Sequence, residues 1–506
     1  MPKPEPLVAH RSSLERRVSG QPGRQFRRRL LSGAVAGAGL AALAGGGSRT
    51  WSAARQGATP AAFVPGAAFI PPRELRSTDG RLDVALQARF GPARMGERDV
   101  TTYTYDGEVP GPTLRLRPGD TLGVSLANQM DESTNFHTHG LHVSPMGNSD
   151  NVLLKIGPHE QIDLAFDIPR DRTSGLYIPG FYWYHPHLHG NTSQQVGGGM
   201  AGALIVEGAL DELPGIAGLP ERLLILRAAF FDDDGVAMLP HGDDEPAVFV
   251  NGQMQPTLAI APGETQRWRL LNASIFTFMN VSLEGHQLHQ IASDGNPLRE
   301  VWSRDAILIA PGERVEVLVQ GGPAGRYTFR SLPWAQDSEF QAQPDYPLAT
   351  LVSEGPGAEP GPLPSTLFAF EDLRAATIDR RREVVFSETF DPFRTLLDGR
   401  TFDHDRVDQR VSLGATEEWV LRNSSSDTHP FHIHVNDFQV VSINGEPFAA
   451  RSWEDTTSIP AFGEIVIRTR FLDFPGTFVY HCHILDHEDR GMMGVVEVVD
   501  DAAAAR

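Results

Sequence analysis

Three things are scarce in this sequence, and each scarcity excludes a class of protein. There is one cysteine, Cys482, among 506 residues, so no disulfide can form within the chain and the fold must rest on its hydrophobic core. Long apolar runs are also scarce: the Gly/Ala-rich stretch at 32–47 is too short and too weakly apolar for a stable membrane span. Basic residues are outnumbered by acidic ones, giving a net charge of −20, which disfavours binding to nucleic acid or to an anionic membrane.

The basic residues gather at the N-terminus, where residues 1–54 hold nine of them and only two acids. Arg27 to Arg29 precede the mild apolar stretch, and residues 52–54 are small enough to form a cleavage site. This arrangement resembles a twin-arginine export signal, and the alternative is a disordered basic tail. We therefore expect residues 1–54 to be an export signal, residues 55–75 to be a flexible lead-in, and the protein to be periplasmic or extracellular.

The chain also contains a threefold repeat. Glycine and proline are abundant, with 50 and 38 residues, which favours many turns and an all-β fold. One pattern, a glycine turn followed by an alternating strand that ends at asparagine, occurs at 117–128, 261–272 and 413–423. A His-containing strand follows each copy, and an aromatic strand begins at a glycine later in each unit. A period of about 150 residues indicates duplicated domains rather than a solenoid.

The segments between the repeats behave as connectors. Residues 210–220 and 354–365 are rich in proline and glycine and show little periodicity. We therefore expect three β-sandwich domains, at residues 76–208, 218–352 and 366–500.

Ten of the eighteen histidines fall into four short clusters in the outer repeats. The clusters are His137-Thr-His139, His185-Pro-His187, His429-Pro-Phe-His432-Ile-His434, and His481-Cys482-His483 with His487. A lone histidine is usually a surface or core residue, but a density this high indicates a metal site, and imidazole and thiolate ligands suit copper. Residues i and i+2 of a strand face the same way, so each His-x-His pair points two imidazoles at one place.

The same strand parity predicts a second site. Cys482 faces away from its two histidine neighbours, and His429, three residues before His432, faces away from His432. A thiolate from Cys482, imidazoles from His429 and His487, and a weak axial thioether from Met492 make the ligand set of a blue-copper electron-transfer site. Met493 competes for the axial position, and a packed core methionine is the alternative reading of Met492.

With these residues the sequence resembles the three-domain multicopper oxidases, the family of laccases and metal oxidases. The motifs His-Cys-His-x3-His-x4-Met and His-Pro-x-His-x-His carry the resemblance and hardly occur together elsewhere, and the repeat plan matches over residues 76–500. The resemblance implies three cupredoxin-like Greek-key β-sandwich domains, with a copper cluster shared by the first and the third. The middle domain, whose histidine-containing segment keeps only His286 and His289 and no cysteine, is then a copper-free spacer.

The resemblance further implies four copper ions: one type 1, one type 2 and a type 3 pair. The type 2 ion would be held by His137 and His432, the type 3 pair by His139, His185, His187, His434, His481 and His483, and the type 1 ion by His429, Cys482, His487 and Met492. Cys482, bonded to His481 and His483, would carry electrons between the sites. Glu488 and Asp150 are candidate proton donors, and the alternative is that both are structural acids.

The implied reaction is the oxidation of phenols and aromatic amines, coupled to reduction of O2 to water, in a monomeric protein. A cuprous oxidase is the first alternative, but such enzymes often carry a Met-rich insert near the type 1 copper, and residues 366–428 contain no methionine. A copper nitrite reductase is disfavoured because such chains usually have two domains. A copper-free structural relative is disfavoured because every ligand is present. The sequence leaves open the physiological reductant and the residues that bind it.

Overall fold

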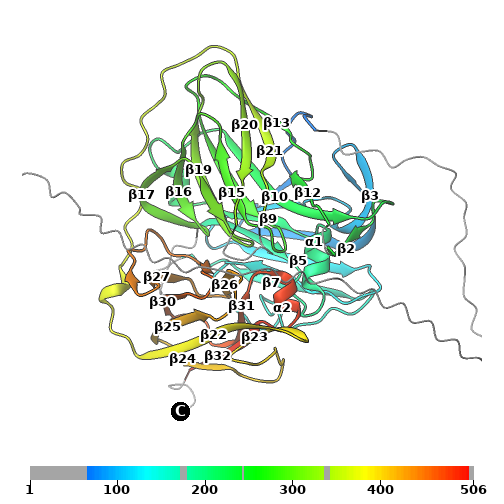
Figure 1. The fold of residues 1–506 in the computed structure, drawn as a ribbon, viewed down its shortest axis with the longest axis vertical. Coiled ribbons are helices and arrows are strands. Elements are labelled where there is room, and N and C mark those ends of the chain that lie inside the picture. The colour runs from blue at the N-terminus through cyan, green and yellow to red at the C-terminus, as the bar shows by residue number, and fades with distance from the viewer. Residues whose placement is uncertain (1–64, 171–178, 242–243, 336–341, 501–506) are drawn as a thin grey trace, which may run out of the picture. The chain divides into compact units, whose positions relative to one another are not determined.

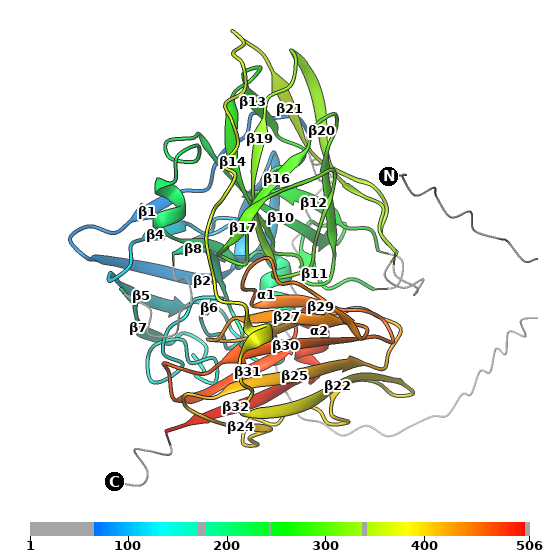
Figure 2. The same cartoon turned by 90° about the vertical axis from the view of Figure 1, so that its left-hand side faces the viewer.

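Residues 65–170, 179–241, 244–335 and 342–500 are described in the computed structural model, and they form three β-sandwiches in sequence order. All of these residues lie in one unit that covers 59–506. Within them, helix is limited to short segments: α1 (Thr192–Gly198), α2 (Leu485–Asp489) and the 3-10 turns Ala209–Glu212 and Leu373–Ala375. Figure 1 and Figure 2 show the middle sandwich in green and the third in yellow to red. The all-β prediction is confirmed.

The first sandwich consists of a five-stranded and a four-stranded sheet. The five-stranded sheet contains, in spatial order, β1 (Glu74–Arg76), β4 (Thr113–Leu116), β9 (Gly202–Val206), β8 (Gly180–His185) and β6 (His137–His139). The other contains β3 (Arg98–Tyr105), β2 (Arg81–Met95), β5 (Thr121–Asn128) and β7 (Gln161–Asp167). Alternate residues of β2, including Leu82, Val84 and Leu86, point into the core, as the period of two in a strand requires.

The middle sandwich packs a seven-stranded sheet on a five-stranded one. The first contains β11 (Ala237–Met238), β10 (Glu221–Phe231), β14 (Thr265–Asn272), β19 (Arg314–Gln320), β16 (Leu288–Ser293) and β17 (Asn296–Arg304), with β12 (Ala247–Val250) also paired to β10. The second contains β13 (Thr257–Ile260), β21 (Tyr346–Ser353), β20 (Gly325–Leu332), β15 (Met279–Leu283) and β18 (Ile307–Ile309). Its core is apolar and includes Trp268, Met279 and Phe329.

The third sandwich has a similar plan. One sheet contains β23 (Phe393–Leu397), β22 (Arg380–Phe390), β25 (Thr416–Asn423), β30 (Glu464–Arg470), β27 (Phe438–Ile443) and β28 (Glu446–Pro447). The other contains β24 (Gln409–Ser412), β32 (Met493–Val499), β31 (Gly476–Cys482), β26 (His429–Ile433) and β29 (Thr456–Ile459). Its core includes Trp419, Tyr480 and the side chains of Cys482 and Met492.

The sequence repeat corresponds to a repeated structural device. The asparagines Asn128, Asn272 and Asn423 end β5, β14 and β25, and each is buried. In every copy Nδ2 donates to main-chain carbonyls of neighbouring loops, and Oδ1 accepts the N–H two residues later, at 3.0, 3.1 and 2.9 Å. A buried amide needs such partners, so each asparagine fixes the loop that leads to the next strand. The prediction of three β-sandwiches is confirmed, and all three share this asparagine contact.

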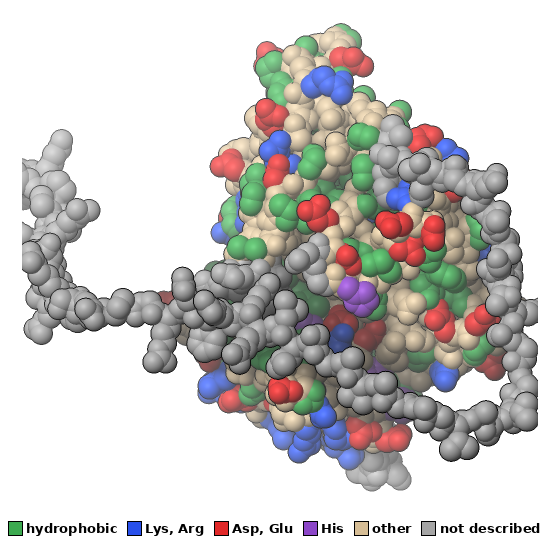
Figure 3. Space-filling view, turned by 45° about the vertical axis from the view of Figure 1, so that its right-hand side comes forward, with side chains coloured by type: hydrophobic (Ala, Val, Ile, Leu, Met, Phe, Trp, Pro, Cys, Tyr) green, Lys and Arg blue, Asp and Glu red, His purple; other side chains and the backbone are tan. Residues whose placement is uncertain are grey.

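The chain before β1 contacts the middle sandwich. Residues 66–70, at the end of the predicted lead-in, hydrogen-bond with residues 253–257, and Ala68 forms a parallel bridge with Thr257. The predicted export signal, residues 1–54, lies outside the described residues. Among the described residues, no helix is long and apolar enough to cross a membrane. Figure 3 shows acidic side chains spread over one face, between apolar and basic ones.

Candidate metal centre

Eight of the clustered histidines are brought together from the first and third sandwiches. They lie on or directly after β6, β8, β26 and β31, and all are buried: His137, His139, His185, His187, His432, His434, His481 and His483. Strand register explains part of the arrangement. His137 on β6 lies opposite His185 on β8, and His432 on β26 lies opposite His481 on β31, where directly opposed side chains are in contact range.

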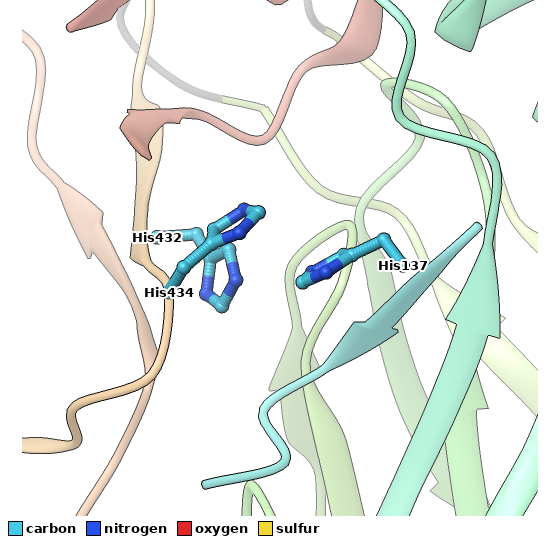
Figure 4. A group of neighbouring side chains, drawn as sticks. All are labelled: His137, His432 and His434. Carbon is cyan, nitrogen blue, oxygen red and sulfur yellow. The ribbon is translucent and has the colours of Figure 1, made fainter. Parts of the chain in front are cut away.

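The two sandwiches meet through stacked imidazole rings. His137 stacks on His434 with ring centroids 4.0 Å apart, and His139 stacks on His432 at 3.8 Å, both at an interplanar angle of 11°. Figure 4 shows the ring of His137 pointing from its strand toward those of His432 and His434 across the space between the sandwiches. The cluster is therefore complete only when the first and third sandwiches are joined.

Three ring nitrogens converge on one point. The Nε2 atoms of His187, His434 and His481 lie 3.0, 3.2 and 3.3 Å from one another. A metal ion about 2 Å from each of three nitrogens in a plane would hold them about 3.5 Å apart. The observed triangle is slightly tighter than that, and a small outward movement of each ring would admit an ion.

Four of the five remaining cluster histidines have one nitrogen without a hydrogen-bond partner, and both ring nitrogens of His483 are unpaired. His137 contacts Asp150 through Nδ1 at 3.0 Å, His185 contacts the Pro186 carbonyl through Nδ1 at 2.9 Å, and His432 contacts the Asp455 carbonyl through Nδ1 at 2.8 Å. In all three, Nε2 is buried and unpaired. His139 is reversed: its Nε2 contacts Asp455 and Thr456, and its Nδ1 is unpaired. Buried imidazoles held at one nitrogen and open at the other are the donor set that a metal ion requires.

Burial favours the neutral form of seven of the eight cluster imidazoles. Burial lowers the pKa of His185 to about 3, and burial together with the neighbouring imidazoles lowers the pKa of His137, His187 and His483 well below the usual value. Neutral imidazoles keep a lone pair for coordination, so protons do not compete with a metal ion near neutral pH.

A second group lies on the other face of the same tripeptide. Cys482 Sγ is 3.5 Å from His429 Nδ1 and 3.9 Å from His487 Nδ1. Ser425 fixes the tautomer of His429: its hydroxyl donates to Asn423 Oδ1 at 2.7 Å, so it accepts from His429 Nε2–H at 2.7 Å and leaves Nδ1 as a lone pair. Burial raises the pKa of the Cys482 thiol, so a thiolate at this position needs a cation beside it.

The structure separates the two candidate axial methionines. Met492 belongs to the same core cluster as Cys482, and the Cys482 N–H donates to the Met492 carbonyl at 3.1 Å. Met493 packs in a different cluster, with Val152 and Val479. Strand parity therefore directs Met492, and not Met493, toward the group that contains Cys482.

Both acids singled out from the sequence are buried beside cluster histidines. Glu488, on α2, has its carboxyl oxygens 3.5 Å from His187 Nδ1 and 3.3 Å from His481 Nδ1, and burial raises its pKa well above the usual value. Asp150 accepts from the Thr138 N–H at 2.8 Å as well as contacting His137, and burial raises its pKa to about 7.

Several residues near these groups were missed from the sequence. Glu388, on β22, lies 3.6 Å from His429 Nε2 and 3.7 Å from His487 Nδ1, and Asp455 contacts His139. No short-range pattern marks either acid, because Glu388 and Asp455 lie 41 and 316 positions from His429 and His139. Beside His487 lies Phe393, with ring centroids 6.3 Å apart, and Phe390 follows at 6.0 Å.

The histidines outside the clusters have structural contacts. His286, in the middle sandwich, accepts from the Gly322 N–H at 3.0 Å and contacts the Glu284 carbonyl through its other nitrogen. His289 bonds Ser303 on the neighbouring strand at 2.7 Å. Both rings are half-buried, whereas those of the cluster histidines are buried, and His286 uses both of its ring nitrogens in these contacts.

Comparison with known proteins gives the same picture over nearly all of the described chain. Family models described as multicopper oxidase match residues 91–211, 219–355 and 374–502. The multicopper oxidase mco of Staphylococcus haemolyticus is 29% identical over 447 residues, covering 84% of this chain and 90% of that protein.

Solved structures show the same fold. A multicopper oxidase from Campylobacter jejuni, described as a metallo-oxidase, superposes with a TM-score of 0.76 at 26% identity, over 86% of this chain and 96% of that one. A laccase-like multicopper oxidase from Ochrobactrum, described as active on lignin model compounds, gives a TM-score of 0.73 at 28% identity, over 85% and 100%.

Proposed function

The chain belongs to the multicopper oxidase family, and from that premise we propose that it oxidises phenols and aromatic amines in the manner of a laccase while reducing O2 to water. It is an oxidoreductase that binds copper. The observation that carries the proposal is the tripeptide His481-Cys482-His483, whose sulfur faces one group of ligands while its two imidazoles face another.

We assign four copper ions to the two groups. A type 1 ion is held by His429, Cys482, His487 and Met492. A type 2 ion is held by His137 and His432. A type 3 pair is held by two trios, His139 with His185 and His483, and His187 with His434 and His481. The convergent Nε2 atoms of the last trio and the unpaired nitrogens of the other cluster histidines support this division.

Copper, when bound, supplies the one-electron steps and the oxygen chemistry that side chains cannot perform. The chain's own residues bind, orient and connect. Cys482 is joined through the main chain to His481 and His483, so the two sites are a single residue apart along a covalent path. Ser425, Asp150 and the Pro186 carbonyl hold ring tautomers, which is how outer partners usually tune ligand imidazoles.

Two buried acids are suited to carry protons to the shared cluster. Glu488 contacts two imidazoles of one trio, and Asp150 contacts His137. Burial raises the pKa of both carboxyls, which favours proton exchange by these acids beside the rings that they contact. We assign Glu488 and Asp150 as proton donors on this basis.

The surface beside His487 favours an aromatic reductant. Phe390 and Phe393 are 69% and 40% exposed, and they form a tilted pair whose second ring neighbours His487. Exposed aromatic rings bind other rings by offset or edge contacts. The described residues 366–428 contain no methionine that would bind Cu(I) there. The name of the Ochrobactrum relative, which refers to lignin model compounds, agrees with this substrate class.

We further propose that the protein is exported and works as a monomer. The twin arginines in 1–54 support export, and the acidic body suits a protein that stays in solution by charge.

Oxygen uptake with a phenol, an aromatic amine and Cu(I), measured side by side on copper-loaded protein, tests the proposed function. We expect the two aromatic reductants to be oxidised with higher kcat/KM than Cu(I). A clear preference for Cu(I) would reassign the protein to metal oxidation, the description of the Campylobacter relative. No uptake with any of the three would contradict an oxidase function altogether.

A further inference from the structure

One side chain of the middle sandwich joins all three sandwiches. Arg314, at the start of β19, is fully buried. Its Nη1 and Nη2 donate to the two carboxylate oxygens of Asp455 in the third sandwich, at 2.8 and 2.6 Å. Its Nε donates to the Phe181 carbonyl on β8 of the first sandwich, at 3.2 Å, and Nη1 also reaches Asp294 of its own sandwich. Such a fork of donors suits a carboxylate bound through both oxygens.

Asp455, the acid that Arg314 holds, contacts one imidazole from each metal-binding sandwich. Its Oδ1 lies 3.2 Å from Nε2 of His139, which comes from β6 of the first sandwich. Its main-chain carbonyl lies 2.8 Å from Nδ1 of His432, which comes from β26 of the third. The unpaired nitrogens of these two rings are His139 Nδ1 and His432 Nε2. The carboxylate thus explains why His139 exposes the opposite nitrogen from His137, His185 and His432.

The neighbouring backbone leaves room for this arrangement at two glycines. A Cβ on Gly140, the residue after His139, would collide with the carboxylate of Asp455 and the guanidinium of Arg314. A Cβ on Gly312, two residues before Arg314, would lie 2.9 Å from the ring of His483. The middle sandwich therefore approaches the histidine cluster closely at Gly312, and the first sandwich approaches the Arg314–Asp455 pair closely at Gly140.

The charges around Arg314 favour a single strong pair. The carboxyl groups of Asp294, Glu313, Asp437 and Glu454 are buried nearby, and burial raises the pKa of each, to about 7 for Asp294 and about 8 for Glu313. Burial also works to raise the pKa of Asp455, but the Arg314 guanidinium outweighs it and holds that pKa below its usual range. Asp455 is the one of these acids that pairs with Arg314 through both of its carboxylate oxygens.

We propose that Arg314 is a positioning residue for the copper cluster: by clamping Asp455, it sets the ring orientation and the free nitrogen of His139 and His432. The inference rests on the proposed function, because it assumes that these two rings bind copper. It gives the middle sandwich a part in the cluster, to which it contributes no ligand. It also predicts that the type 1 group, held wholly by the third sandwich, is independent of Arg314.

Arg314→Lys is the first test, because lysine keeps the charge but cannot donate to both oxygens of Asp455. Arg269→Lys is the matched control. Arg269 is also buried in the middle sandwich and also holds carboxylates, but its partners are Asp211, Glu221 and Glu316 rather than an acid beside a histidine. Copper per chain, the visible band of thiolate-bound copper, the electron paramagnetic resonance signal of type 2 copper and the melting temperature are measured for both variants and the parent.

We expect Arg314→Lys to keep the parent's visible band per chain while its affinity for cluster copper falls about 10- to 100-fold and its type 2 resonance changes. Arg269→Lys should lower the melting temperature without either change. Cluster copper and type 2 resonance equal to the parent's in Arg314→Lys would overturn the inference. Equal loss of both copper signals in the two lysine variants would also overturn it, since that pattern indicates general destabilisation.

Asp455→Asn is a second variant that tests the role of the Arg314–Asp455 pair if Arg314→Lys does not fold. It preserves the size of the side chain and removes the charge that Arg314 holds. We expect the same change in type 2 resonance with the visible band retained, and an unchanged resonance would contradict the inference. A parent protein that shows no visible band and no oxygen uptake would instead contradict the proposed function, and the inference with it.

Discussion

The third and the middle sandwiches share one arrangement of strands, but different side chains occupy the corresponding positions. In the third, β26 carries His429 and His432, and β31 carries His481 and Cys482, with His483 directly after it. In the middle, the corresponding β15 and β20 carry no histidine, and Met279, Val281 and Phe329 fill the core instead. The tryptophans behave alike: Trp419 packs edge-on against Tyr480 and Trp268 against Phe329, both at 5.4 Å. The framework therefore fixes strand positions, while a few side chains decide whether a sandwich binds metal.

The largest effect is expected when the sulfur of Cys482 is replaced, because the third sandwich then lacks a thiolate ligand, as the middle one does. In Cys482→Ser we expect loss of the visible band and a fall in turnover with organic reductants of at least about 1,000-fold, because a hydroxyl is a poor ligand for type 1 copper. The fold should survive, since no disulfide depends on Cys482. Visible spectra and oxygen uptake check this, and a blue or normally active variant would show that the sulfur is not the ligand.

A second feature of the third sandwich is α2, which follows β31 and brings Glu488 to the cluster. Glu488→Gln should slow oxygen reduction about 100-fold, because a proton donor at that position is removed, while the visible band and its reduction by a phenol stay normal. Stopped-flow reoxidation measures this. Turnover that matches the parent across pH would remove Glu488 from the mechanism and leave it a structural acid.

The shared asparagines allow a matched pair of substitutions. Asn272→Ala and Asn423→Ala each leave buried main-chain groups unpaired, so both should reduce the free energy of unfolding by about 2 kcal/mol. Only Asn423→Ala should also shift the visible band, because Asn423 accepts from Ser425, which holds His429. Chemical denaturation and visible spectra separate the two effects. An equal spectral response in the two variants, or none in either, would contradict a specific effect of Asn423 on the copper site.

The smallest expected effect concerns the surface. The β22–β23 hairpin exposes Phe390 and Phe393, whereas β10 of the middle sandwich buries Phe230 against Phe276 at 5.7 Å. Phe393→Ala should raise KM for a phenol about five-fold, the loss of one aromatic contact, with kcat nearly unchanged. A small inorganic reductant is the control, and its KM should not move. An equal rise for both reductants would indicate a general disturbance of His487.

Much of this arrangement follows from the sequence, and the reason lies in short-range geometry. Strand parity is enough to direct Cys482 away from His481 and His483, and the repeat is enough to expect three sandwiches. Parity says nothing about residues that meet across sandwiches. Asp455 lies 316 positions from His139, and Arg314 lies 141 from Asp455, so no local pattern joins them. The reversed nitrogen of His139 depends on that contact and was not predictable.

We propose that one sandwich holds a sulfur-ligated copper and that two sandwiches share a histidine-ligated cluster. The most direct measurement is the copper content of the loaded wild-type protein, together with its visible and electron paramagnetic resonance spectra. We predict about four copper ions per chain, one with the intense band of a thiolate ligand at about 600 nm and one with a separate type 2 resonance. A colourless protein, or one that holds a single ion, would contradict it.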